Sequence, residues 1–388
     1  MTAPFGAYQA EIYLLGLDDV VPAFTTDGSA LEESAKRILE SGPFWYVAGA
    51  AGSGATARAN REAFDRWRIV PRMLRDATRR TLATSVLGTS MPAPVMTAPL
   101  GVQAILHPDG ELATARATAA LGVPMILSTA SSQTIEDVAA ASGDGPRWYQ
   151  LYWPNDDDVC VSILERAQKA GFTHLVVTLD TWTVAWRPRD LDGAYLPFLR
   201  GVGTAIPFSD PAFRATLAAP PEEDLPSAVL KWVSTFTGED KSWDRLPFLR
   251  QHWDGPIVLK GILHPTDARR AADAGMDGIV VSNHGGRQVD GAIAALDALP
   301  AVVAAVGDRL AVLFDSGIRT GADVVKALAL GARAVLIGRP FAYGLAHGGE
   351  DGVRHVLRSL LADLDLTVGL SGYRGIAELT PEALTQRP

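Results

Sequence analysis

Short apolar segments recur along the chain and alternate with longer segments of mixed polarity. Eight of them are five or six residues long, and most are rich in β-branched side chains. Apolar runs without a polar residue at every second position are typical of strands buried on both faces of a parallel sheet. The eight predicted strands cover residues 94–98, 123–128, 147–152, 173–178, 256–260, 277–282, 310–315 and 333–338.

Apolar residues at helical spacing fill most of the intervals between these strands. The clearest predicted helices lie at residues 111–120, 157–170, 265–274 and 321–330. Eight strand–helix units fit a closed (β/α)8 TIM barrel, an α/β fold, better than an open sheet. Polar residues and glycines follow each predicted strand. Because barrel enzymes assemble their sites at the carboxyl ends of the strands, we expect one site at the mouth.

Two regions fall outside the repeat. Residues 1–90 precede the first strand and are mainly helical in pattern, so we expect an N-terminal helical cap. Residues 184–253 form a 70-residue insertion after strand 4, far longer than an ordinary connection. We interpret it as a lid over the mouth; the alternative is a subunit contact or a segment without a role in the site. The expected organisation is a single domain over 1–388, with the barrel at 91–365 and a C-terminal tail at 366–388.

The composition narrows the class of protein. The 388 residues carry a net charge of -9 without a segment that concentrates Lys and Arg, so nucleic acid is not an expected partner. No apolar run reaches the ~18 residues of a membrane helix, and the first basic residue is Lys36, so neither a membrane span nor a signal peptide is expected. The single cysteine, Cys160, excludes a disulfide framework. Together these features predict a soluble, cytoplasmic protein. The histidines lack metal-ligand spacing, so no metal site is expected.

The most informative segment is Ser-Asn-His-Gly-Gly-Arg-Gln at residues 282–288, at the end of the sixth predicted strand. His284 places a titratable imidazole there, two glycines let the backbone approach a ligand, and Arg287 adds a guanidinium. A lone histidine is more often structural. The polar ends of the seven other strands favour a functional His284.

A second cluster follows the last two predicted strands. It contains Asp315, Gly317 and Arg319, and then Gly338 and Arg339. In barrels these two strand ends commonly bind phosphate through loop N–H groups, a helix N-terminus and arginine. Two arginines match a phosphate dianion; the alternative is a pair of surface arginines that balance an acidic protein.

Three more charged residues follow the fourth and fifth strands. Asp180 is a candidate to orient His284, and Arg187 is a candidate counter-ion for an anionic substrate. From the sequence alone, the pairing of Asp180 with His284 is a hypothesis. Lys260 ends the fifth strand, where a buried ammonium favours negative charge that develops on a bound ring or enolate.

These motifs resemble the FMN-dependent L-2-hydroxy acid oxidase family. The likeness extends over about residues 46–384, and its most specific segments are 282–288, 315–332 and 337–340. Residues 186–191 and the long insertion make the chain most similar to the lactate 2-monooxygenase branch. The resemblance implies FMN as the cofactor, a small 2-hydroxy acid and O2 as substrates, and a homotetramer or homo-octamer.

The resemblance also implies a role for each site residue. His284 is the base that takes a proton from the substrate, and Asp180 holds the resulting imidazolium. The other catalytic assignments are the carboxylate clamps Arg187 and Arg287, the hydrogen-bonding Tyr46 and Tyr152, and Lys260 beside the flavin. The residues implied to bind FMN are Ala98, Pro99, Gly101, Ser128, Gln150, Thr178, Lys260, Ser282, Asp315, Gly317, Arg319, Gly338 and Arg339.

Three positions depart from the commoner family pattern. Gly101 stands where simple oxidases commonly carry alanine, which resembles the monooxygenase branch with its crowded site. Ser316 replaces a glycine of the phosphate loop. Ala130 stands where relatives often carry a larger side chain, which widens the pocket and leaves room for a substrate bulkier than lactate.

The leading hypothesis for the reaction is that of L-lactate 2-monooxygenase, in which lactate and O2 give acetate, CO2 and water. The alternatives among enzymes are an oxidase that releases keto acid and H2O2, including one for a bulkier substrate, and a dehydrogenase that avoids oxygen. The alternative from another class is a flavin-binding sensor without turnover. Hydride and carbanion mechanisms use the same residues, so both stay open.

Overall fold

A closed barrel of eight parallel strands forms the centre of the computed structural model, which describes residues 4–238 and 241–387. In chain order the strands are β4 (Val95–Thr97), β5 (Met125–Ser128), β6 (Arg147–Leu151), β7 (Leu175–Thr178), β8 (Ile257–Ile262), β9 (Gly278–Val281), β10 (Ala311–Phe314) and β11 (Ala334–Ile337). The barrel closes where β11 pairs with β4. Each of the eight predicted segments overlaps one strand, so the predicted (β/α)8 fold is confirmed.

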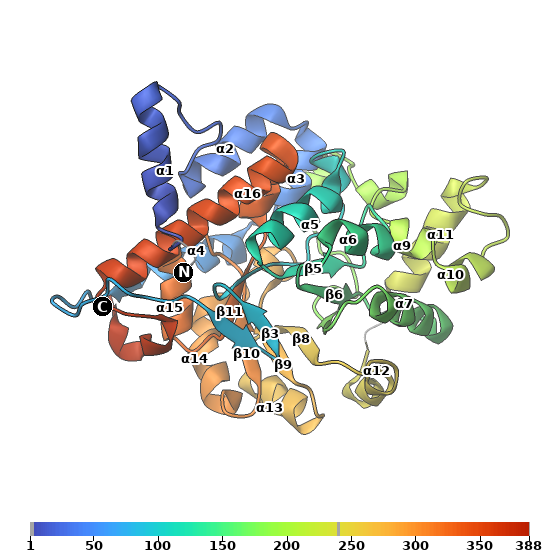
Figure 1. Cartoon of the computed structure of the whole chain (residues 1–388). Helices are drawn as coiled ribbons and strands as arrows, with labels where there is room; N and C mark the ends of the chain where they lie inside the picture. Colours follow the sequence, from blue (N-terminus) through green and yellow to red (C-terminus); the bar gives the residue numbers. More distant parts are fainter. Residues whose placement is uncertain (1–3, 239–240, 388) are drawn as a thin grey trace.

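Helices surround the barrel, as Figure 1 shows. They are α5 (Gly110–Leu121), α6 (Ile135–Ser142), α7 (Asp157–Lys169), α13 (Pro265–Asp273), α14 (Ala295–Val306), α15 (Gly321–Ala329) and α16 (Arg339–Leu370). Helix α7 begins where Asp156 accepts a hydrogen bond from the backbone N–H of Val159, and α15 begins with a capping box of Thr320 and Asp323. The four predicted helices agree with α5, α7, α13 and α15 to within one residue at each end.

The barrel interior is a hydrophobic cluster of its own. Each strand contributes one buried side chain to it, except β11, which contributes two: Met96, Ile126, Trp148, Val176, Val258, Val280, Leu313, Ala334 and Leu336. The flanking residues of each strand belong to the outer cluster with the helices, which explains why the strands are apolar on both faces. The antiparallel hairpin of β2 (Thr84–Val86) and β3 (Thr89–Met91) adds Val86 and Met91 to the inner cluster.

Four helices of the cap precede the barrel: α1 (Ala7–Leu15), α2 (Gly28–Ile38), α3 (Ser41–Ala48) and α4 (Ala55–Asp65). The strands of this region were not predicted. Beyond the hairpin, β1 (Trp67–Ile69) pairs antiparallel with β12 (Leu384–Gln386) at the chain end. Helix α16 continues to Leu370, so the predicted start of the tail at 366 lies inside a helix. The reason is that Asp365 on α16 is buried and binds Arg80, at 2.6 Å, together with the backbone N–H of Gly6.

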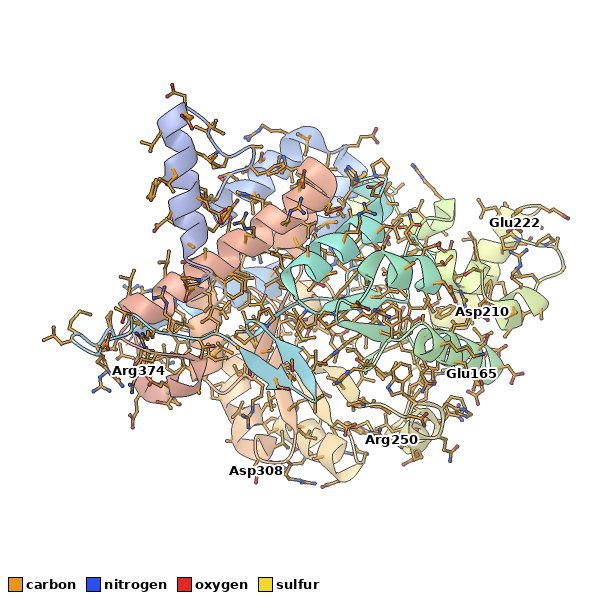
Figure 2. The ribbon with its side chains drawn as sticks, in the orientation of Figure 1. Glu165, Asp210, Glu222, Arg250, Asp308 and Arg374 are labelled. Atoms are coloured by element: carbon orange, nitrogen blue, oxygen red, sulfur yellow. The ribbon has the colours of Figure 1, made fainter. Side chains whose placement is uncertain are left out.

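The described part of the insertion between β7 and β8 folds into five α-helices: α8 (Pro188–Asp192), α9 (Ala205–Phe208), α10 (Pro211–Ala215), α11 (Leu225–Phe236) and α12 (Leu246–His252). Of these, α10 and α12 contact α7, and α8 contacts α3 of the cap (Figure 1). Asp210, labelled in Figure 2, caps α10 and forms an ion pair of 3.1 Å with Arg166 of α7. The Asp210 carboxylate is buried, so this contact fixes the insertion to the barrel wall.

Seven 3-10 turns complete the described part of the chain: η1 (Gly16–Asp18), η2 (Gln103–Ile105), η3 (Pro197–Arg200), η4 (Trp243–Arg245), η5 (His284–Gly286), η6 (Ile376–Glu378) and η7 (Pro381–Ala383). Turn η5 holds the predicted catalytic histidine. Among the residues described, no helix is both long and apolar enough to cross a membrane.

Candidate active site

A cavity opens at the carboxyl ends of the barrel strands, where the sequence predicted the site. Fourteen predicted site residues line it: Tyr46, Ala98, Pro99, Gly101, Tyr152, Arg187, Lys260, His284, Arg287, Asp315, Gly317, Arg319, Gly338 and Arg339. The other five, Ser128, Gln150, Thr178, Asp180 and Ser282, lie on the strands or loops behind this lining. The fold therefore brings the predicted residues together from all parts of the barrel.

His284 and Asp180 form a hydrogen-bonded pair beside the cavity. The imidazole Nδ1 lies 2.9 Å from Asp180 Oδ1, and Thr181 Oγ1 is 3.1 Å from the same nitrogen. Burial lowers the pKa of His284, while Asp180 opposes that shift. Burial acts to raise the pKa of Asp180, but His284 and Lys260 outweigh it and hold the pKa at about 2. At neutral pH this favours a neutral imidazole that donates Nδ1–H to a carboxylate and leaves Nε2 as an acceptor.

The loop that carries His284 is fixed from the cap. Asn60 of α4 and Asn283 exchange two amide hydrogen bonds of 2.8 and 2.7 Å, and Asn283 Oδ1 also accepts from the N–H of Gly286. His284 has a φ of +56°, in the left-handed region that disfavours side chains other than glycine. Such strain persists only where the surroundings determine the backbone, and here both loop and cap contacts do so.

Two guanidinium groups lie close together on one side of the cavity. Arg187 donates from Nε to the carbonyl oxygen of Arg287 at 3.0 Å, and the Arg287 guanidinium lies 5.4 Å from the Tyr46 ring centre. Burial, together with the charges of Arg187 and Arg339, lowers the pKa of Arg287 to about 9. Neither Arg187 nor Arg287 forms an ion pair with a carboxylate among the residues that the structure describes. An anionic ligand would satisfy both.

Lys260 of β8 lies buried at the cavity floor. Its ammonium is 3.1 Å from Asp315 Oδ2 and donates to Ser282 Oγ at 3.0 Å. Burial works against the charge, but Asp315 and Asp180 outweigh it and raise the pKa of Lys260. The ammonium is therefore charged at neutral pH and presents a fixed positive charge to whatever the cavity binds.

A second pair of guanidinium groups lies at the ends of β10 and β11. Burial and the charge of Arg339 together lower the pKa of Arg319 to about 10. Arg339 at the start of α16 donates to the carbonyl oxygens of Val47, Gly49 and Gly285. Neither arginine has a carboxylate partner in the described ranges. A half-buried pair of like charges of this kind suits a dianion such as phosphate.

The polar atoms and the open space at the strand ends fit FMN. Beyond the arginines, two buried polar atoms at the strand ends, Gln150 Nε2 and Thr97 Oγ1, have no hydrogen-bond partner in the described part of the chain. Buried polar groups are rarely left unpaired, so both call for a bound group. At Gly338 an added Cβ would meet only the Ala98 Cβ, at 3.8 Å, which leaves open space against the backbone. These features suit a planar heterocycle with a phosphate.

Comparison with known proteins decides the family. The family model described as FMN-dependent dehydrogenase matches residues 35–386. The chain belongs to this family. It is 50% identical to an FMN-dependent alpha-hydroxy acid dehydrogenase of Penicillium citrinum, over 98% of the chain and 96% of the relative. The expected family, an FMN-dependent 2-hydroxy acid oxidoreductase, and the FMN cofactor are thereby confirmed.

Two further relatives extend the comparison. The chain is 40% identical to an L-lactate oxidase of Lysinibacillus sphaericus, over 90% of both chains. Its structure is similar to that of a mandelate oxidase, with a TM-score of 0.82 and 39% identity over 94% of this chain and 99% of the other. The names of both relatives describe oxidation of a 2-hydroxy acid, which agrees with the FMN-dependent family to which the chain belongs.

Several residues of the site were missed by sequence reasoning. Thr181 contacts His284, and Asn60 holds the His284 loop from the cap. From the insertion, Phe198, Trp232 and Phe236 line the cavity. Thr181 follows Asp180 directly and was open to prediction, whereas the other residues follow no predicted strand and carry no local signal.

Proposed function

We propose that His284 is the general base that takes a proton from an L-2-hydroxy acid while two electrons leave its Cα–H bond. The observation that carries this proposal is that the His284–Asp180 pair and the Arg187–Arg287 pair flank one cavity. The proton comes from the hydroxyl in a hydride mechanism and from Cα in a carbanion mechanism. Bound FMN supplies the two-electron acceptor. Asp180 stabilises the imidazolium that results, because its carboxylate stays ionised.

The remaining polar residues position the reactants in this proposal. Arg187 and Arg287 hold the substrate carboxylate, and the neutral hydroxyls of Tyr46 and Tyr152 donate hydrogen bonds to the carboxylate or hydroxyl. Burial raises the pKa of Tyr152, which keeps that donor protonated. At the cofactor end, Arg319 and Arg339 would hold the phosphate, while Lys260 and Gln150 would face the ring.

The fate of oxygen is the finer part of the proposal. We infer a monooxygenase, in which the 2-oxo acid stays bound and reacts with peroxide to give a carboxylic acid, CO2 and water. Gly101 supports this, since a Cβ there would lie 2.5 Å from the carbonyl oxygen of Ala130. The loops after β4 and β5 are therefore packed against each other at this side of the site, and we infer that this packing favours retention of the product. Whether lactate is the substrate depends on the size and lining of the pocket.

Two measurements test the function. Anaerobic addition of a 2-hydroxy acid is expected to bleach the yellow protein, and aerobic turnover is expected to yield one CO2 per O2 without free peroxide. Stoichiometric peroxide would show an oxidase, and bleaching without oxygen consumption would show a dehydrogenase. Protein that binds FMN but never bleaches would show a sensor, and protein that does not bind FMN would refute the cofactor assignment.

A matched pair of variants separates catalysis from folding. His284→Asn is expected to abolish bleaching while FMN stays bound. His264→Asn is the control, because His264 caps α13 at the surface and asparagine is also a good cap. Cytoplasmic location and an assembly of four or eight copies remain predictions; light scattering on the purified protein tests the assembly.

A further inference from the structure

The insertion supplies a row of aromatic rings to the cavity. Phe198 and Trp232 stack with their ring centres 4.6 Å apart, and Trp232 stacks on Phe236 at 5.9 Å. The edge contact of Tyr46 with Phe198, at 6.2 Å, joins this row to the ring that lies beside the Arg287 guanidinium. An uninterrupted aromatic surface therefore runs from the proposed carboxylate clamp into the insertion.

A small residue leaves space beside this row. Ala130, on the loop after β5, lines the same cavity. Gly203 packs between that loop and the aromatic row: a Cβ on Gly203 would lie 3.0 Å from both the Ala130 carbonyl oxygen and Phe198 Cε1. Ala130 and the aromatic row are thus close neighbours through Gly203, and Ala130 contributes a side chain no larger than a methyl group to the cavity lining.

Apart from Arg187 at the clamp, the insertion contributes only uncharged side chains to the cavity lining, since Val184 and Thr237 are its members besides the three aromatic residues. A second carboxylate or an ammonium on the substrate side chain would lose its hydration here without gaining a partner. Flat apolar groups gain contact area and stacking on the same wall. The part of the cavity lined by the insertion therefore excludes dicarboxylic hydroxy acids and favours a substrate with an aromatic side chain.

We propose that the substrate is an aryl-bearing L-2-hydroxy acid, of the size of mandelate or 3-phenyllactate, and that Trp232 and Ala130 determine this specificity. The inference rests on the proposed function, because it places the carboxylate at Arg187 and Arg287. A single methylene in an apolar pocket changes kcat/KM by roughly 10- to 200-fold. Exchange of a methyl for a phenyl group is accordingly expected to change it by about 100-fold or more.

The test is the rate of anaerobic flavin reduction in the FMN-loaded protein with L-lactate, L-mandelate, L-3-phenyllactate and L-malate. The second-order rate constant is expected to be at least about 100-fold larger for the better aryl acid than for lactate, with no reduction by malate. Equal or faster reduction by lactate overturns the specificity while it supports the function. No reduction by any acid of the panel overturns the function itself, so the two failures are distinct.

Variants locate the specificity. Trp232→Leu and Ala130→Leu are each expected to lower the ratio of aryl acid to lactate by tenfold or more, one by removing the wall and the other by filling the space. Leu230→Ala is the control, because Leu230 lies on the same helix and is 67% exposed. It is expected to keep the wild-type ratio. If Trp232→Leu does not fold, Ala130→Leu decides, and an unchanged ratio in every folded variant overturns the assignment.

Discussion

His284 Nδ1 and Asp180 Oδ1 lie 2.9 Å apart, although one residue follows β9 and the other follows β7. Strand β8 separates these two strands in the barrel, and its Lys260 carries the charge that also faces Asp180. The Asp180 carboxylate thus interacts with both the His284 imidazole and the Lys260 ammonium. These interactions keep the carboxylate ionised and leave the histidine free to accept a proton.

Asp180→Asn is expected to lower kcat/KM by about 10²- to 10⁴-fold, the usual contribution of proton transfer by a positioned side chain. The direction in which the pH dependence of kcat/KM shifts follows from the interaction between His284 and Asp180. Burial holds the pKa of His284 below its ordinary value of about 6.5, so the wild-type rate falls only at acidic pH. Asp180 raises that pKa, so its loss moves the acidic limb to lower pH. A pH profile of kcat/KM checks this, and an unmoved limb in the variant contradicts it.

Arg287→Met is expected to cost about 2.7 to 4 kcal/mol of transition-state stabilisation, by analogy with the loss of one electrostatic donor. Arg287→Lys keeps the charge but loses the forked geometry, so it is expected to recover only part of the activity. Steady-state kinetics checks that kcat/KM falls in the order wild type, Arg287→Lys, Arg287→Met. A loss below tenfold in Arg287→Met would show that the substrate carboxylate binds elsewhere.

Gly101→Ala is expected to destabilise the protein by about 1 to 3 kcal/mol, the usual cost of overpacking. The added Cβ would lie 2.5 Å from the carbonyl oxygen of Ala130 and 2.8 Å from its Cβ, so the β5 loop must move. Thermal unfolding of the FMN-loaded protein measures the change. An unchanged midpoint would mean that the two loops are less closely packed than the structure has them.

Two variants of Ser316 are expected to differ in stability. Ser316 Oγ accepts from the N–H groups of Asn283 and Gly285 and donates to Asp315 Oδ1 at 2.8 Å, at a φ of +81°. Ser316→Ala leaves both N–H groups without this acceptor, at a cost of about 1 to 3 kcal/mol. Ser316→Gly loses the same bonds but relieves the left-handed backbone by about 1 kcal/mol. Unfolding midpoints should therefore rank serine first, glycine second and alanine last.

Glu111 predicts a pH dependence of stability. This fully buried carboxylate accepts from the N–H groups of Gln103 and Ser132, yet burial raises its pKa to about 7. Between the ordinary value of about 4.3 and pH 7, the folded protein keeps a proton that the unfolded chain releases. This contribution to stability therefore falls as pH rises through that window and is constant above it.

The neutral Glu111→Gln keeps an acceptor oxygen and escapes this loss. Relative to the wild type, its free energy of unfolding is expected to increase by up to about 3 kcal/mol between pH 5 and pH 8, at 1.36 kcal/mol per unit of pKa. Urea unfolding of both proteins at several pH values gives the difference. A difference that does not vary with pH would show that Glu111 is ionised throughout.

The barrel and most of its chemistry were predictable because both follow local patterns. Buried parallel strands leave apolar runs, and their carboxyl ends meet at one mouth, so residues such as Lys260 and Asp315 could be assigned to one site without knowledge of any contact. The pairing of Asp180 with His284 was only a hypothesis, since its geometry depends on how the loops after β7 and β9 fold.

The contributions of the cap and the insertion could not be predicted. Asn60 reaches Asn283 across 223 positions of sequence, and Trp232 reaches the cavity from a segment without strand or glycine signals. Strands as short as β1 and β12, with three residues each, carry no readable alternation and depend on their partner.

The pairing of β1 with β12 has a consequence for synthesis on the ribosome. Trp67 pairs with Gln386, so β1 leaves the exit tunnel long before the strand with which it pairs. Helix α2, near the start of the chain, likewise packs against α16 near its end. Contacts of such long sequence separation form late. The nascent cap is therefore without its final partners until residues 384–386 have left the ribosome, and a chain that stops short of residue 384 leaves β1 as an open edge.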